Sequence, residues 1–420
     1  MHHFHYKNGE MYCEDVPVVT IAEAVDTPFY LYAHATLVQH FNAFDGAFEG
    51  TRHLTCFSMK SNSNLAVLRL FAGLGGGVDI VSGGELFRAL KAGVDPKKIV
   101  YSGVGKREED LRFALSSDIL MFNVESSQEL MRLNDIAGTM NKKAGIAIRV
   151  NPDVDPKTHP YISTGLRENK FGIDIREAPE QYTVAAGLKN IKVLGVSCHI
   201  GSQLTEVAPF VDAMAKLMGL VGELEEAGIP VAFLDLGGGL GITYDREEPP
   251  HPKEYAGAIK EMVSRSNVTL VFEPGRVIVG NAGILVAKVL YTKSTPEKNF
   301  VVVDAAMNDL MRPSLYHSFH AIQPVQGKRR GSMQANIVGP ICESGDFLAK
   351  DREVDAYEPG DLLAVMSAGA YGFSMSSTYN SRPRVAEVMV RGDRFYTIRQ
   401  RETHEDLVRG EEIPDFLLNG

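Results

Sequence analysis

The sequence predicts an α/β chain in which a (β/α)8 barrel is followed by an all-β domain. Strand and helix patterns alternate from residue 29 to residue 275, whereas strand patterns without helices dominate after residue 283. Such alternation requires parallel strands, and about eight units in roughly 250 residues fit a closed barrel better than an open sheet. We place the barrel at 28–280 and the β domain at 1–27 plus 281–420.

The predicted barrel strands are short runs rich in apolar and β-branched residues. They lie at 29–32, 54–60, 77–82, 99–103, 119–125, 144–152, 193–201, 233–239 and 270–275. The intervening segments are amphipathic, as in the run from Glu85 that stops at Gly93. The glycine fingerprint G-x-G-x-x-G of an open dinucleotide-binding sheet is absent, because Ile242, directly after DLGGGLG, occupies its third glycine position.

The C-terminal part has strand patterns separated by Pro, Gly and Asp, which predict a sandwich or a Greek-key barrel. The runs lie at 284–291, 299–307, 334–342, 361–371 and 384–399. The first residues of the chain are expected to add an edge strand to this domain.

Composition and charge exclude several classes of protein. With 44% hydrophobic and 23% charged residues, the chain is too apolar for extended disorder. A net charge of -10 argues against a nucleic-acid partner, because an acidic surface repels phosphate. No apolar run approaches the roughly 20 residues that span a bilayer, and the first residues do not resemble a secretory signal. We therefore expect neither membrane insertion nor export.

The four cysteines are widely scattered, which predicts reduced thiols in a cytoplasmic protein. No Cys and His residues have the spacing of zinc ligands, so no metal site is expected.

Reactive or charged residues stand where five of the predicted barrel strands end. They are Lys60, Asp79 with Ser82, His199 with Ser202 and Gln203, Gly237 to Gly239, and Glu273 with Arg276. Barrel enzymes carry their catalytic groups at the carboxyl ends of the strands. The positions therefore predict one site on this rim.

Each of these residues also has a purely structural interpretation. Spacing alone favours an ordinary solvent-exposed side chain for Lys60 over an amine desolvated for Schiff-base chemistry. The glycine cluster fits a tight turn as well as it fits a phosphate cradle. A buried Glu273 needs a proton or a cation, which a neighbouring residue or a ring nitrogen could supply. For His199 and Asp79, too, the sequence allows both a structural and a functional interpretation.

The predicted β domain carries a second group of polar residues in loops. CESGDF places the thiol of Cys342 beside a carboxylate, while MRPSLY and GAYG add Arg312, Tyr316 and Tyr371. Cys342 alone is expected to be a small buried apolar residue. Together, these loops indicate half of a site.

The order of the motifs resembles one enzyme family over nearly the whole chain. FSMKSN, GVDIVSGGEL, HIGSQ, LDLGGGLGI, EPGR, VDAAMNDLMRPSLY, CESGD and GAYG occur as in the meso-diaminopimelate decarboxylases, which are pyridoxal-phosphate enzymes with an alanine-racemase-like barrel. The resemblance implies a homodimer with shared active sites. It also implies conversion of meso-2,6-diaminopimelate to L-lysine and CO2, the last step of lysine biosynthesis.

The resemblance assigns a role to each matching residue near the cofactor. Lys60 would hold pyridoxal phosphate as an aldimine, His199 would stack on its ring, and Glu273 would bind the ring nitrogen. Asp79 would complete this side of the cofactor site. The phosphate ligands would be Ser202, Gly238, Gly239, Gly275 and Arg276.

The same resemblance implies how the substrate is bound. Arg276, Arg312 and Tyr316 would hold its distal carboxylate, and Tyr371 would touch both cofactor and substrate. The partner subunit would supply Glu343 for the distal ammonium and Cys342 to protonate the carbanion left by CO2. A substrate charged at both ends needs a guanidinium and a carboxylate at its non-reacting end, which MRPSLY and CESGD supply.

Three alternatives remain beside this interpretation. A sister decarboxylase acting on ornithine, lysine, arginine or carboxynorspermidine is the nearest, because few residues decide the substrate. A racemase would have no use for CESGD, and a non-catalytic regulator would have lost Lys60 and Glu273. Residues 155–172 resemble the mobile segment of the family and are predicted to form a lid.

Overall fold

The computed structural model describes residues 2–155, 170–264, 266–328 and 330–418. The chain divides into a barrel unit, Leu37–Gly280, and a β-rich unit made of Met1–Thr36 and Asn281–Gly420. Most of the predicted lid at 155–172 lies outside the described residues.

The barrel unit is a closed ring of eight parallel strands, which confirms the fold predicted from the alternating pattern. In order around the ring, the strands are β5 (His53–Ser58), β6 (Gly77–Ile80), β7 (Ile99–Tyr101), β8 (Met121–Val124), β9 (Ala144–Asn151), β11 (Ile191–Ser197), β12 (Phe233–Asp235) and β13 (Thr269–Phe272). Pairing of β13 with β5 closes the ring. A two-residue strand, β10 (Ile173–Asp174), pairs with the end of β9.

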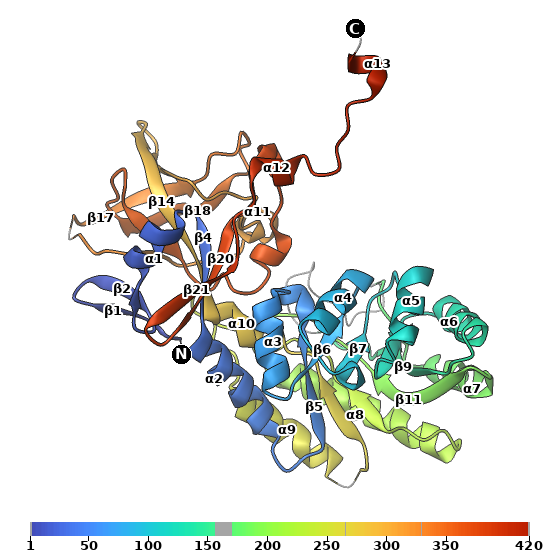
Figure 1. The fold of residues 1–420 in the computed structure, drawn as a ribbon. Coiled ribbons are helices and arrows are strands. Elements are labelled where there is room, and N and C mark those ends of the chain that lie inside the picture. Colours follow the sequence, from blue (N-terminus) through green and yellow to red (C-terminus); the bar gives the residue numbers. More distant parts are fainter. Residues whose placement is uncertain (1, 156–169, 265, 329, 419–420) are drawn as a thin grey trace. The chain divides into compact units, whose positions relative to one another are not determined.

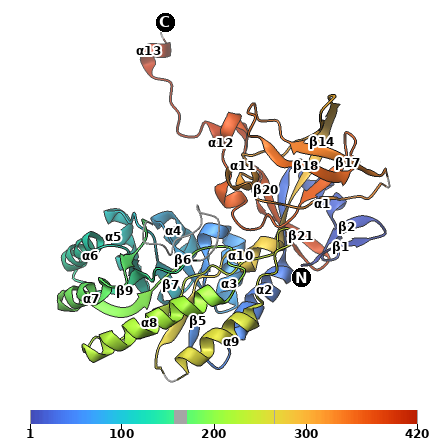
Figure 2. The same ribbon diagram turned by 180° about the vertical axis from the view of Figure 1, so that it is seen from behind.

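Helices surround the barrel on its outside (Figures 1 and 2). They are α2 (His34–Asp45), α3 (Leu65–Gly73), α4 (Gly83–Lys91), α5 (Glu108–Ser116), α6 (Ser127–Thr139), α7 (Ala178–Gly187), α8 (Ala208–Glu226), α9 (Pro252–Val263) and α10 (Arg276–Val279). The side chains of Asn64, Ser82 and Ser126 accept backbone hydrogen bonds at the starts of α3, α4 and α6. Gly93 follows the end of α4 with φ of +80°, as expected for a residue that stops a helix.

The inside of the barrel changes from apolar to polar toward the carboxyl ends of the strands. An apolar cluster contains Cys56, Val100, Met121, Ala147 and Val271. Two residues further along the same chain segments stand Ser58, Ser102, Asn123, Arg149 and Glu273. Side chains two residues apart share one face of a strand, so both sets face inward. The barrel therefore carries a polar layer on an apolar floor.

The β-rich unit is built around one large sheet, with the strand order β18-β17-β15-β14-β4-β20-β21. Strand β19 also pairs with β14, and β16 pairs with β19. The bounds are β4 (Phe29–Ala33), β14 (Gly283–Ser294), β15 (Asn299–Val303), β16 (Ile322–Pro324), β17 (Ser332–Val338), β18 (Phe347–Asp355), β19 (Leu362–Val365), β20 (Ala386–Arg391) and β21 (Arg394–Arg399). Four short helices accompany it: α1 (Val18–Val25), α11 (Arg312–Tyr316), α12 (His404–Leu407) and α13 (Asp415–Leu418).

Two N-terminal segments lie elsewhere than predicted. The run at 29–32 forms β4, which pairs with β14 and β20 in the β-rich unit and is not a barrel strand. All five residues of β4 are buried, and a fully buried strand shows the same pattern in either kind of sheet. The unit boundary consequently follows Thr36 and not residue 27. The first residues form a separate sheet of β1 (Phe4–Lys7), β2 (Glu10–Cys13) and β3 (Val16–Pro17) instead of an edge strand.

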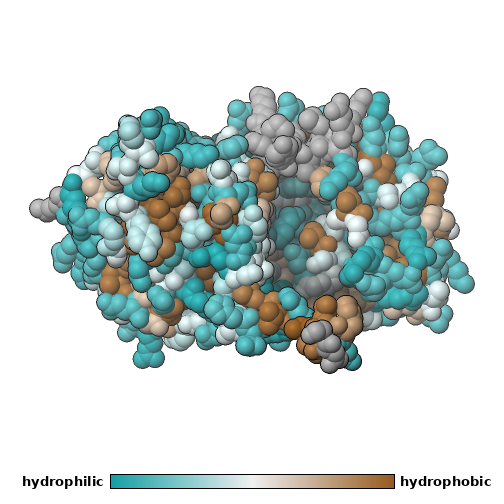
Figure 3. Space-filling view, turned by 90° about the horizontal axis from the view of Figure 1, so that it is seen from above, coloured by the Kyte–Doolittle hydropathy of each residue, from teal (hydrophilic) through white to brown (hydrophobic). Residues whose placement is uncertain are grey.

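The surface is mostly hydrophilic on the face shown in Figure 3, where apolar side chains form small separate patches. An exception is the C-terminal segment, in which α13 stands apart from its sheet (Figure 1). Its exposed apolar residues are Ile413, Phe416, Leu417 and Leu418. Among the described residues, no helix is both long and apolar enough to cross a membrane.

Candidate active site

Lys60 and Asp79 meet at the polar end of the barrel. Lys60 lies in a single helical turn, Met59–Ser61, directly after β5. Its Nζ is 3.2 Å from Oδ2 of Asp79 on β6, and the hydroxyl of Ser58 donates to the same oxygen at 3.1 Å. The Lys60 side chain is 36% exposed, whereas that of Asp79 is fully buried. A buried carboxylate thus holds an amine that is reachable from solvent.

A cluster of carboxyl groups lies deeper in the barrel. Glu273, directly after β13, accepts a hydrogen bond from the Ser102 hydroxyl at 3.2 Å and is 6% exposed. Burial raises the pKa of Glu273 well above its usual value, and the nearby Asp235 and Asp79 add to the effect. Burial likewise raises the pKa of Asp235 to about 6. Three carboxyl groups therefore share this space with the single ammonium of Lys60.

His199 faces the glycine-rich turn after β12. The Gly238 N–H donates to Nδ1 of His199 at 3.2 Å, which places the imidazole proton on Nε2 in the neutral ring. Desolvation and the cations Lys60 and Arg149 lower the pKa of His199 well below its usual value. A neutral ring of this kind suits packing against a planar ligand. The sequence predicted that the Gly238 N–H binds phosphate, but in the structure this N–H donates to His199.

Ser202 and Arg276, both predicted to bind the cofactor's phosphate, are hydrogen-bonded neighbours in the structure. One guanidinium nitrogen of Arg276 donates to Ser202 Oγ at 3.1 Å, and another donates to the Tyr244 hydroxyl at 2.6 Å. Arg276 is 6% exposed, so its charge is largely desolvated. A guanidinium and a hydroxyl side by side provide donors for a phosphate group.

The glycines at this end have a packing reason in addition to any ligand contact. A Cβ on Gly238 would lie 2.3 Å from the carbonyl oxygen of Glu273, and one on Gly239 would lie 2.6 Å from that of Gly201. Gly239 also has φ of +119°, which side chains rarely tolerate. At Gly275, a Cβ would lie 3.0 Å from the Ser61 hydroxyl oxygen. Substitution at these positions would force the loops of the rim apart.

Of the predicted substrate residues, Arg276 lies in the barrel unit, and the others lie in the β-rich unit: Arg312, Tyr316, Glu343 and Tyr371. Arg312 begins α11, is 5% exposed, and donates to Ser318 Oγ at 3.2 Å. The centre of its guanidinium is 6.0 Å from the centre of the Tyr316 ring, so these two predicted residues are neighbours. Tyr371 has φ of +55°, a strained conformation for a residue with a side chain.

Cys342, Glu343 and Ser344 of the CESGD loop are exposed, which corrects the expectation that Cys342 is buried. Asp346 of the same loop is buried. The Cys342 N–H donates to Oδ1 of Asn380 at 3.1 Å. The Tyr379 hydroxyl donates to Glu343 Oε2 at 2.8 Å. The thiol and the carboxylate of these two neighbouring residues are therefore both exposed to solvent.

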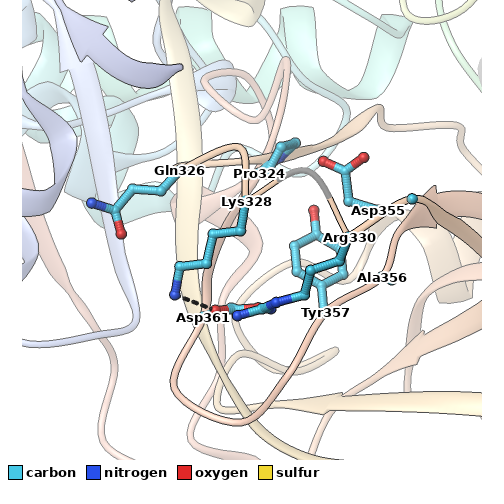
Figure 4. Close-up of a pocket in the computed structure, with 9 residues that line it drawn as sticks. Pro324, Gln326, Lys328, Arg330, Asp355, Ala356, Tyr357 and Asp361 are labelled. Carbon is cyan, nitrogen blue, oxygen red and sulfur yellow. Dashed lines mark hydrogen bonds and ion pairs between the residues drawn. The ribbon is translucent and has the colours of Figure 1, made fainter. Parts of the chain in front are cut away.

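A cavity of about 220 Å³ in the β-rich unit has a different character (Figure 4). Its two cations are already paired with acids, because Lys328 and Arg330 both bind the carboxylate of Asp361 and Arg330 also binds that of Glu358. None of the predicted site residues lines this cavity. No group of three or more His, Cys, Asp or Glu side chains in the described part of the chain could hold a metal ion.

Several polar residues of the site were not singled out from the sequence. Asn123 on β8 donates to Asp235 at 2.8 Å, and Arg149 on β9 forms a buried ion pair with Glu125 at 2.8 Å. A signal was available, because a charged or amide side chain inside an apolar strand run needs a buried partner. FLD and MFNV both contain such a residue.

Comparison with known proteins agrees with this geometry. Residues 34–280 match the model of a family described as "Pyridoxal-dependent decarboxylase, pyridoxal binding domain". The chain belongs to the pyridoxal-dependent decarboxylases. Diaminopimelate decarboxylase from Vibrio cholerae is 52% identical, with 98% of this chain and 99% of that protein covered. The structure of diaminopimelate decarboxylase from Helicobacter pylori complexed with L-lysine is 44% identical, with a TM-score of 0.91 over 93% of this chain and 98% of that chain.

The site fits the cofactor that this family of pyridoxal-dependent decarboxylases uses. The carboxyl groups around Glu273 outnumber the cations that contact them, which leaves room for a positively charged ring nitrogen. Oδ1 of Asp79 is buried and has no hydrogen-bond partner among the described residues. Ser202 and Arg276 offer donors for a phosphate, and Lys60 offers an amine for the aldehyde. The cofactor predicted from the sequence, pyridoxal phosphate, is confirmed by the family.

Proposed function

We propose that this chain decarboxylates meso-2,6-diaminopimelate to L-lysine and CO2 with pyridoxal phosphate, as a carboxy-lyase of lysine biosynthesis. One observation carries the proposal: the chain is 52–53% identical, over nearly its full length, to enzymes named diaminopimelate decarboxylase. These relatives favour the main prediction over the sister decarboxylases. The presence of Lys60 and Glu273 at the same end of the barrel, close enough to interact electrostatically, argues against a non-catalytic regulator.

The barrel unit would hold the cofactor. The ring and aldehyde of pyridoxal phosphate supply an electron sink for the pair of electrons left at Cα when CO2 departs. Lys60 would bind the aldehyde carbon, and Glu273 would accept a hydrogen bond from the ring nitrogen. His199 would pack against the ring. Ser202 and Arg276 would donate to the phosphate, and Gly239 and Gly275 would let the loops approach it.

The β-rich unit would recognise the non-reacting end of the substrate. Arg312, beside Tyr316, would bind the distal carboxylate, a task for which a planar guanidinium is suited. Glu343 would bind the distal ammonium, with its carboxylate held in place by the Tyr379 hydroxyl. A substrate without a distal carboxylate could not form this paired contact with the guanidinium of Arg312, which is 5% exposed. This arrangement predicts selectivity for diaminopimelate over ornithine, lysine and arginine.

The test of this function is a product analysis. The protein loaded with pyridoxal phosphate is incubated in parallel with meso-diaminopimelate, ornithine, lysine and arginine. We expect L-lysine and CO2 from diaminopimelate and no diamine from the other three. A diamine from one of them would show that a sister activity is the true one, while no turnover with any substrate would favour the regulator.

We also propose a homodimer in which each active site uses residues of both subunits. Cys342 and Glu343 support it, because they are neighbouring exposed residues on a loop of the β-rich unit, where a second subunit can reach them. The exposed apolar residues of the C-terminal segment offer further surface for association. We place the protein in the cytoplasm, since all four cysteines are free thiols.

A mixing experiment checks the shared site. Lys60→Ala and Cys342→Ala proteins, each inactive alone, are combined under conditions that allow subunit exchange. Half of the resulting dimers are mixed, and each mixed dimer has one intact site, so we expect about one quarter of the wild-type activity to return. No recovery, while native mass spectrometry shows mixed dimers, would contradict a site that takes Lys60 from one subunit and Cys342 from the other.

A further inference from the structure

Asp235 and Glu273 form a buried acid pair that the proposed reaction does not by itself explain. Asp235 ends β12 and is fully buried, and Glu273 follows β13 with 6% exposure. The two carboxyl groups lie within hydrogen-bonding reach of each other. Two ionised carboxylates at that separation in a buried space would repel strongly, so one proton between them is the stable arrangement.

Asn123 links the two members of the pair. Its Nδ2 lies 2.8 Å from Oδ2 of Asp235 and 3.3 Å from Oε1 of Glu273. The Gly237 N–H donates to the other oxygen of Asp235 at 2.9 Å. Two N–H groups donate hydrogen bonds to Asp235 and stabilise its charged form. Glu273 accepts a hydrogen bond from the Ser102 hydroxyl and only a longer one from Asn123. The shared proton therefore resides mainly on Glu273.

The groups around the pair determine what can displace that proton. The titratable and charged residues that face it from neighbouring strands and turns are Lys60, Asp79, Cys56, Cys198 and Tyr255. Burial raises the pKa of both thiols and of the Tyr255 hydroxyl, so these three stay neutral. The ammonium of Lys60 is taken up by Asp79 at 3.2 Å. With its proton, the pair retains one negative charge.

We infer that Asp235 is a positioning residue for the cofactor, and that the acid pair releases its shared proton when a cationic pyridine ring binds beside Glu273. The O–H bond at Glu273 breaks and the proton passes to solvent, while the ring keeps its N–H and donates it to the Glu273 carboxylate. No electrons are transferred. The inference rests on the proposed function, because it takes Glu273 as the partner of the ring nitrogen.

The inference has a consequence for binding at different pH. If binding displaces one proton, affinity increases by up to about tenfold for each pH unit over the range in which the pair is protonated in the free protein. The sign follows from mass action, since lower proton concentration favours the proton-free, ring-bound form. Within that range the shared proton opposes binding, and above it the dependence on pH disappears.

The variant Asp235→Asn tests the role of Asp235. An Asn side chain at 235 can still accept from the Gly237 N–H, and its amide can donate to Glu273 in place of the shared proton. Asn123 has a buried Oδ1 without a partner among the described residues, which can receive a donor if this amide turns. Glu273 then stays an anion without a proton to release. The substitution is nearly equal in volume, so the barrel is expected to fold.

The probe is pyridoxine 5′-phosphate, which has the same ring and phosphate but no aldehyde, so it forms no bond to Lys60. Binding to the full-length protein freed of cofactor is measured by calorimetry in two buffers of different ionisation enthalpy, between about pH 6 and about pH 8. We expect the wild type to release about one proton and to gain affinity with pH, and Asp235→Asn to release much less and to show a flat profile. Titration of the probe itself is common to both proteins and cancels in the comparison.

Asp304→Asn is the matched control, because Asp304 also has a pKa raised mainly by burial but lies in the β-rich unit. It is expected to behave as the wild type. A wild type that releases no proton, or an Asp235→Asn protein that releases as many as the wild type, overturns the inference. Turnover of meso-diaminopimelate by the wild type is measured alongside, so that a failure of the proposed function is recognised separately.

Discussion

Replacing Lys60 by alanine is expected to lower kcat by at least about 1,000-fold, the largest effect of any single substitution in this chain. The amine at this position lies 3.2 Å from the Asp79 carboxylate, which holds it at the open end of the barrel. Without the amine, the cofactor has no nitrogen in this position to bond to, and Asp79 is left as a buried carboxylate without its cation. The loss of the amine and the loss of the cation beside Asp79 both weaken the way in which the site holds the cofactor.

The measurement combines turnover with borohydride reduction and peptide mapping. The wild type should carry one reducible cofactor adduct per chain, at Lys60, and Lys60→Ala should carry none. Lys97→Ala is the matched control, since Lys97 pairs with Asp118 on the surface of the same unit, with both side chains more than half exposed. An adduct at full stoichiometry in Lys60→Ala would show that another lysine holds the cofactor.

Replacing Cys342 by alanine is expected to lower kcat by about 100-fold to 10,000-fold with little change in KM, the range that a positioned general acid contributes. The thiol is exposed on the CESGD loop, and the loop is held by the Cys342 N–H bond to Asn380, which alanine preserves. Loss of the thiol therefore removes the proposed proton donor without releasing the loop.

Steady-state kinetics and the stereochemistry of deuterium incorporation in D2O distinguish this role from a structural one. The product formed by Cys342→Ala should carry deuterium at Cα with reduced stereospecificity, because solvent then reaches the carbanion from either side. Ser344→Ala, on the same exposed loop, controls for changes in the loop itself. Normal turnover and unchanged stereospecificity in Cys342→Ala would exclude the thiol as the proton donor.

Local sequence patterns determined the architecture of the barrel and the content of the rim. Strand alternation is a property of neighbouring residues, so the runs at 54–60 through 270–275 indicated the eight barrel strands before any contact was known. The carboxyl ends of parallel strands always meet at one rim, which is why Lys60, Asp79 and Glu273 could be grouped from position alone. The resemblance then named a cofactor that their chemistry fits.

Tertiary structure alone decided which of these residues touch and which strands belong to which sheet. Asp235 and Asn123 are 112 residues apart, and Asn123 and Glu273 are 150 apart, yet one amide contacts both carboxyl groups. The β4 run has the pattern of a barrel strand but pairs with β14 and β20. The local sequence predicts whether a strand is buried on both faces. The strand with which it pairs depends on the packing of the whole unit. Contacts between distant segments, and the shared proton that they allow, arise only when the ring of strands closes.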